Sequence, residues 1–450
     1  MSHNKIEFGR HTLKYSILLL IAILAAGLLV GTTAAVPIIT ATKTDVLAVD
    51  NDGDGKADPG DVISYTVVIT NSGDTGAANV VFNDTIDSNS SLVAGSLRTT
   101  PLARNDSYTS IGNVGISVPA GSGVLVNDND PDGTTPTLTI VSFDATSANG
   151  GNVVLAANGS FTYAPPPGFE GADSFGYTVQ DSDGNLDTAV VFITVSDVIW
   201  FVDNSAATQG DGRLNSPYNS LGGAGGYNAT AADDPGDSIF IYSGFGNYAG
   251  GISLLNSQLL IGQGASAPIS SITGISVPAF SNVLPATGGG KPTIVNSSGD
   301  GVLLAQGNLL RGFNVGDTSG VGISDNGGTA GNLTISEVAI SGTGGGIEVD
   351  NGGTLAVALD SLSASSSSDE GLHLANVSGT ISVAATSGTL TMTGVPAVVI
   401  DGNPSLALTL TFLSVSSTNA AQGISIRDTT GSFTVTGTGA TAGSGGTLSG

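Results

Sequence analysis

The chain has 450 residues, more than one compact core usually holds, so several structural units are expected. Its 37 acidic and 11 basic residues give a net charge of −26, which argues against nucleic acid as a partner, since phosphate binding needs basic surface. The 67 glycines and 11% charged residues are typical of a strand- and turn-rich protein, and the absence of cysteine excludes disulfide bonds.

The amino terminus has the pattern of an export signal. Basic side chains at Arg10 and Lys14 precede an apolar run from Ile17 to Val30, and small residues follow as far as Ala35. The run is shorter than the ~20 residues that cross a bilayer as a helix, so residues 1–35 are predicted to be a cleaved signal peptide. The alternative is an uncleaved signal anchor, which would be the protein's contact with the membrane. Either way the chain is expected outside the cytoplasm: extracellular, at the cell surface or at the outer membrane.

Residues 43–98 are predicted to form a small antiparallel Ig-like β-sandwich. Strands are expected at 62–69 and 78–84, with a turn at 71–74 between them. The wording DGDGKADPGDVISYTVVITNSGDTGAANVVFNDTID resembles the conserved Ig-like repeat of bacterial and archaeal envelope proteins. This resemblance implies a cell-surface module.

The same region contains the best candidate site, an acidic loop over residues 50–61. Its carboxylates fall at the positions that bind calcium in an EF-hand-type loop, with Gly55 at the sharp turn and a backbone carbonyl offered by Lys56. The predicted ligands are Asp50, Asp52, Asp54, Lys56, Asp58 and Asp61. Pro59-Gly60 blocks a helix, so a bound Ca²⁺ would brace the start of a sheet. The alternative is an acidic, solvated hairpin.

Residues 101–197 are predicted to be a second Ig-like sandwich. Phrases such as GVLVNDNDPDG (123–133) and GFEGADSFGYTV (168–179) resemble the cadherin-like Ig module of large bacterial adhesins. Alternating aromatic residues are predicted to lie in its core: Phe161, Tyr163, Phe175 and Tyr177.

A second acidic phrase in this module, Asn127–Asp132, is a further candidate for calcium, joined by Asp181 and Asp183. The alternative interpretation is a hydrogen-bonded turn.

From Gly320 onward a short phrase restarts about every 25 residues. The starts lie at Gly320, Gly346, Gly371, Ala397 and Gly423, and apolar residues stand one and three positions after each. Strand repeats of this length cannot bury their apolar faces singly, so they are expected to stack as a solenoid. The segment from Trp200 to Gly264 resembles the opening coils of pectin-lyase-like proteins. Residues 198–450 are therefore predicted to form a parallel β-helix, right-handed by the crossover rule and by this resemblance.

Catalysis is not expected. Residues 201–450 contain four basic residues, Arg213, Lys291, Arg311 and Arg427, and none lies in a phrase typical of a polygalacturonase. His373 is expected to be a solvated side chain, and with His3 and His11 as the other histidines there is little to bind a transition metal. A carbohydrate-active β-helix enzyme, a polysaccharide lyase or hydrolase, remains the alternative.

The chain is thus predicted to be all-β, with two Ig-like β-sandwiches followed by a right-handed parallel β-helix. The expected function is that of an exported cell-surface or extracellular protein with an adhesive or structural role, stabilised by calcium and binding glycans or cell-surface ligands. Residues 436–450 show no amphipathic cap, so the β-helix is expected to be uncapped, with self-association or further coils at its open end.

Overall fold

The computed structural model describes residues 3–9, 36–73, 75–77, 80–132, 138–384 and 388–449. Almost all regular elements are strands, which confirms the predicted all-β class; the α-helix α1 (Ile269–Thr273) and the 3-10 turns η1 (Ala120–Ser122) and η2 (Tyr227–Ala229) complete the described elements. No helix in the described ranges is long and apolar enough to cross a bilayer.

Two compact units are present, and the larger holds residues 194–450 with two short segments, 109–116 and 164–172. The predicted signal peptide lies outside the described residues, apart from the backbone of strand β1 (His3–Gly9).

The first sheet has four strands in the order β2-β3-β1-β4. Strands β2 (Ile39–Val49) and β3 (Val62–Asn71) pair antiparallel across the acidic loop, and β4 is Arg98–Thr99. The strand expected at 62–69 is confirmed, but the one expected at 78–84 is wrong, because the described residues 80–84 form no strand. In the full chain the second edge of β3 is paired with β1, which belongs to the predicted signal segment, so no place beside β3 remains for the strand expected at 78–84. The described residues therefore form one sheet instead of the two facing sheets of the predicted sandwich.

The second predicted module is a two-sheet sandwich, as expected. One sheet has the order β5-β11-β10-β7 and the other the order β6-β9-β8. Their bounds are β5 (Asp106–Ile111), β6 (Ile116–Val118), β7 (Thr139–Phe143), β8 (Asn152–Leu155), β9 (Phe161–Ala164), β10 (Gly171–Gln180) and β11 (Leu186–Ser196). Phe161, Tyr163, Phe175 and Tyr177 are buried, which confirms their predicted place in the core.

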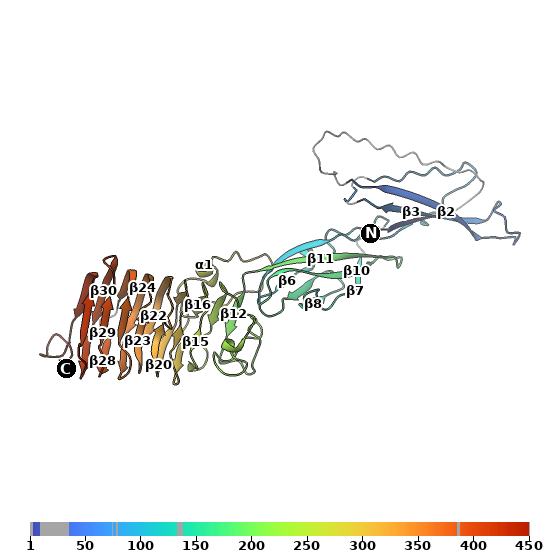
Figure 1. The fold of residues 1–450 in the computed structure, drawn as a ribbon. Coiled ribbons are helices and arrows are strands. Elements are labelled where there is room, and N and C mark those ends of the chain that lie inside the picture. Colours follow the sequence, from blue (N-terminus) through green and yellow to red (C-terminus); the bar gives the residue numbers. More distant parts are fainter. Residues whose placement is uncertain are drawn as a thin grey trace, which may run out of the picture. The chain divides into compact units, whose positions relative to one another are not determined.

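The rest of the chain is a parallel β-helix with three sheets, whose strands stack coil upon coil in chain order (Figure 1). The first sheet comprises β12 (Ile199–Val202), β13 (Ser238–Ile241), β14 (Asn247–Ala249), β16 (Leu259–Gly262), β17 (Thr293–Asn296), β19 (Leu309–Arg311), β20 (Asn314–Thr318), β22 (Asn332–Ile340), β24 (Gly353–Leu362), β27 (Val377–Val383), β30 (Leu406–Phe412) and β33 (Thr430–Val435). The second comprises β15 (Ile252–Ser253), β18 (Val302–Leu303), β21 (Val321–Ser324), β23 (Gly345–Val349), β26 (Leu372–Ala375), β29 (Val398–Asp401) and β32 (Ile424–Arg427). The third comprises β25 (Ala364–Ser366), β28 (Thr389–Thr393), β31 (Ser414–Thr418) and β34 (Leu448–Ser449).

The repeated phrase forms the second sheet, with one correction of register. Ile347 pairs with Leu372, Leu372 with Val398 and Val398 with Ile424, as the predicted starts require. In the first copy Ile323 pairs with Ile347, whereas the predicted start at Gly320 would have placed Val321 there. A slip of two residues keeps the same side chains on the same face, so alternation alone does not distinguish the two registers.

Left-handed residues end several of these strands, as the sequence predicts. Asn326, Asn376 and Asp428 have φ of 50°, 56° and 50°. In the second copy the left-handed backbone falls on Gly352 and Gly353 and not on the preceding Asp350 and Asn351. A residue type that tolerates positive φ is thus available in each of these turns.

The last coil is formed by β32, β33 and β34. Strand β33 pairs with β30 along one edge, and the described residues supply no strand for its other edge. Its side chains are largely exposed, although the Phe433 ring lies 5.6 Å from the Phe412 ring of the preceding coil.

Candidate functional site

The acidic loop between β2 and β3 brings three of its predicted ligands together. One carboxylate oxygen each of Asp50, Asp52 and Asp54 lies within 4.8 Å of the others, and all three side chains are exposed. The backbone arranges them: the N–H groups of Gly53 and Gly55 donate to Asp50 at 2.7 and 2.9 Å. These hydrogen bonds, that from Gly55 above all, lower the pKa of Asp50. Clustered carboxylate oxygens fit a hard cation such as Ca²⁺.

The other predicted ligands have different positions. Asp61 is buried and accepts hydrogen bonds from the backbone N–H groups of Asn51 at 2.9 Å and Asp58 at 3.1 Å, so its carboxylate closes the base of the loop. Desolvation, followed by the charges of Asp52 and Asp61, raises the pKa of Asp58. The side chain of Lys56 forms an exposed ion pair with Asp54 at 3.0 Å. The loop thus has a cluster of three carboxylates above a base held by Asp61.

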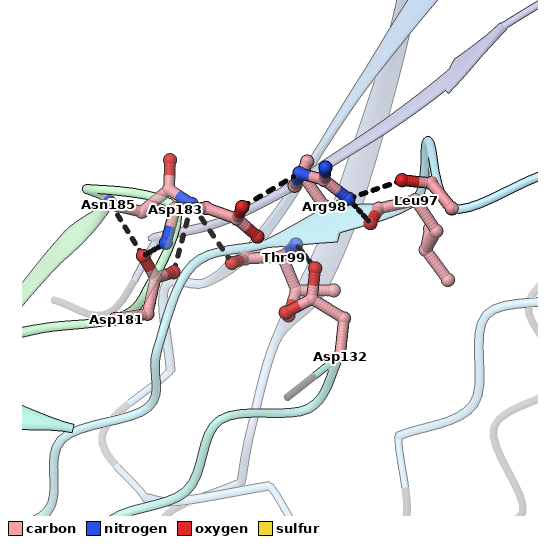
Figure 2. A network of polar contacts seen from close by, with 8 residues as sticks. Leu97, Arg98, Thr99, Asp132, Asp181, Asp183 and Asn185 are labelled. Atoms are coloured by element: carbon pink, nitrogen blue, oxygen red, sulfur yellow. Dashed lines mark hydrogen bonds and ion pairs between the residues drawn. The ribbon is translucent and has the colours of Figure 1, made fainter. Parts of the chain in front are cut away.

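The second acidic phrase belongs to a hydrogen-bonded network around β4 (Figure 2). Asp132 accepts from the backbone N–H and the hydroxyl of Thr99 at 2.8 and 3.0 Å. Arg98 pairs with Asp183 at 3.1 Å, and the side-chain amide of Asn185 donates to Asp181 at 2.9 Å. Each of these three carboxylates therefore faces a donor of its own, and among the residues that the structure describes these aspartates do not gather into a group of three. The arrangement favours the hydrogen-bonded turn.

Two other aspartates of this module meet at a buried tyrosine. The hydroxyl oxygen of Tyr177 lies 3.1 Å from Asp106 and 3.2 Å from Asp128. Burial raises the pKa of Asp106 to about 7 and that of Asp128 to about 6; the charge of Asp128 adds to the first shift and that of Asp187 to the second. Sequence reasoning identified Tyr177 as a core residue but missed this pair, whose signal is an Asn-Asp dipeptide at 105–106 and again at 127–128.

The basic residues of the β-helix are mostly engaged in ion pairs. Arg213 pairs with Asp211 at 2.7 Å, and Lys291 pairs with Asp360. The hydrogen bond from Arg311, at 2.9 Å, lowers the pKa of Glu337 to about 2.

Asp233 and His373 are two further polar side chains of the β-helix. Asp233 accepts a hydrogen bond from the buried Tyr227 at 3.1 Å. His373 is half-buried on the outward face of β26. The hydrogen bond between Tyr227 and Asp233 connects two neighbouring segments.

The two-sheet fold of the second module agrees with a known family. Residues 98–197 match the family model of the bacterial cadherin-like domain. No curated protein matches the chain. Among solved structures, the family 28 exopolygalacturonase of Yersinia enterocolitica aligns with 12% identity over 61% of this chain and 84% of that chain, with a TM-score of 0.11. At so low a TM-score nothing about activity follows. The cadherin-like domain and the β-helix are thus the two well-supported parts of the chain.

Proposed function

We propose that this chain is an exported surface or extracellular protein with an adhesive or structural role. The observation that carries the proposal is the combination of a cadherin-like domain and a parallel β-helix in one acidic, cysteine-free chain. The N-terminal signal pattern supports export. The outward faces of the three β-helix sheets would offer binding surface to glycans or cell-surface ligands.

Binding without turnover is the expected result of the functional test. The full chain is incubated with a panel of anionic polysaccharides, and both retained protein and released sugars are measured. Retention on a glycan or on whole cells, without unsaturated or reducing ends, supports adhesion. Release of such ends would support the alternative, a carbohydrate-active β-helix enzyme. In cells, surface exposure is read by protease digestion of intact cells; complete protection together with cytoplasmic fractionation would contradict the proposal.

Calcium binding at the 50–61 loop is part of the same proposal, because Asp50, Asp52 and Asp54 already converge. We expect Ca²⁺ to raise the melting temperature of the smaller compact unit, which contains the 50–61 loop. A ligand tenfold above its Kd adds about 1.4 kcal/mol to the free energy of unfolding. Replacing both Asp52→Ala and Asp54→Ala should abolish the rise. The matched control is Asp45→Asn, an exposed aspartate on β2 outside the loop, which should keep it. An equal rise in the double variant and the control would remove the loop as the calcium site.

A further inference from the structure

Three metal-ligand side chains converge on the outward face of the second β-helix sheet. Glu348 on β23 pairs in register with His373 on β26, one coil further along, and Asp350 follows β23 directly. One ligand atom of each lies within 4.8 Å of the others, and all three side chains are half-buried. Their neighbours in the strands point inward and are buried: Ile347, Val349, Leu372 and Leu374. The alternation of the two strands thus fixes the three polar side chains on one patch of surface.

The three side chains of this cluster have few polar partners within the protein. Within the described chain, neither the carboxylate of Glu348 nor the imidazole of His373 makes a hydrogen bond or an ion pair, and Asp350 accepts one from the side chain of its neighbour Asn351. Glu348 also lies within electrostatic reach of Asp325, Asp350 and Glu370. A bound cation would relieve the repulsion between these carboxylates.

The donor set selects the class of cation. Calcium takes oxygen ligands, so the three aspartates of the 50–61 loop suit it, whereas an imidazole nitrogen with two carboxylates suits zinc and neighbouring transition ions. We propose that Glu348, Asp350 and His373 bind a divalent transition-metal ion of the zinc class, with a fourth position open to water. The expectation that the histidines offer little to a transition metal is thereby revised, because the register of two coils supplies the carboxylates that sequence proximity to His373 does not. Such an ion would connect β23 to β26.

Zinc titration of the full chain tests this proposal, with millimolar Ca²⁺ present to saturate the acidic loop. We expect one Zn²⁺ per chain by calorimetry, an affinity at least about tenfold lower in His373→Ala, and a similar loss in Glu348→Gln, which preserves shape. Circular dichroism verifies that each variant is folded. Co²⁺ gives a second readout, because Co²⁺ bound by nitrogen and oxygen ligands at a tetrahedral site absorbs in the visible range.

Two controls distinguish this cluster from other parts of the chain. Asp401→Asn lies on the same outward face on β29 and should leave zinc affinity unchanged. The double variant His3→Ala with His11→Ala tests the two N-terminal histidines and should also leave zinc affinity unchanged. Undiminished zinc binding in both His373→Ala and Glu348→Gln, or the absence of stoichiometric binding in the unmodified chain, overturns the proposal.

Discussion

Replacing Gly379 with alanine should destabilise the β-helix by about 2–5 kcal/mol, the sum of left-handed strain and overpacking. Gly379 lies in β27 with φ 94°, and a Cβ there would come within 2.1 Å of the Leu355 carbonyl oxygen. The obstacle is backbone in the paired strand β24, which moves only if the pairing of the two coils is disturbed. The same arrangement recurs where Gly431 of β33 lies against Leu408. The measurement is urea denaturation followed by circular dichroism, with hydrogen exchange of β24 and β27.

Gly352 provides the matched control. Its φ is 93°, nearly that of Gly379, but the nearest atom to an added Cβ is the Asn376 carbonyl oxygen at 3.6 Å, an ordinary contact. Gly352→Ala should therefore show the left-handed strain alone, about 1–2 kcal/mol. Equal losses in the two variants would mean that the close approach of Leu355 does not limit the packing of these coils.

The cadherin-like domain should become less stable as the pH rises from about 4 to about 7. Asp106 and Asp128, with pKa values raised to about 7 and about 6, keep their protons in the folded state at pH values where an unfolded aspartate, with a pKa near 3.8, has lost its own. Unfolding therefore releases protons across this window, and the free energy of unfolding falls as the pH rises. Pulse proteolysis in urea at pH 5 and pH 8, with fragments of residues 98–197 identified by mass spectrometry, measures the change.

Asp106→Asn should flatten this dependence. The amide is neutral at both pH values, and its carbonyl oxygen still accepts a hydrogen bond from Tyr177. Between pH 5 and pH 8 the variant should therefore lose less stability than the unmodified chain does. Asp45→Asn, an exposed position on β2, should leave the dependence unchanged. An unaltered slope in Asp106→Asn would show that the proton is held elsewhere.

The second β-helix sheet shows how much of the fold the periodicity of the sequence could predict. Apolar residues at alternate positions identified five of its seven strands, and the spacing of Gly346, Gly371, Ala397 and Gly423 placed four of them in the correct register. The third sheet, with β25, β28, β31 and β34, was not predicted. Its strands are short and rich in serine and threonine, so their pattern is that of a loop until neighbouring coils supply pairing partners.

The failed strand at 78–84 has a similar cause. Val80 and Val81 have strand propensity, but in the structure Val81 is 74% exposed and both edges of β3 are already paired, with β2 and β1. Strand formation depends on an available edge as well as on residue type.

The candidate sites divide in the same way. The acidic loop was found from sequence because its carboxylates lie within twelve consecutive residues, where local turns alone bring Asp50, Asp52 and Asp54 together. The sequence could not assign Asp61 to the base of the loop, since that role depends on which backbone N–H groups the fold directs toward it. His373 and Glu348 are 25 residues apart and meet because one coil of the β-helix has that length.

By itself the sequence determined the all-β class, the β-helix and its inward face, because these follow from local alternation and repeat length. Only the tertiary structure decided the register of the first copy of the repeated phrase, the buried pair of aspartates at Tyr177 and the cluster at His373. These three features depend on contacts between residues distant in the chain.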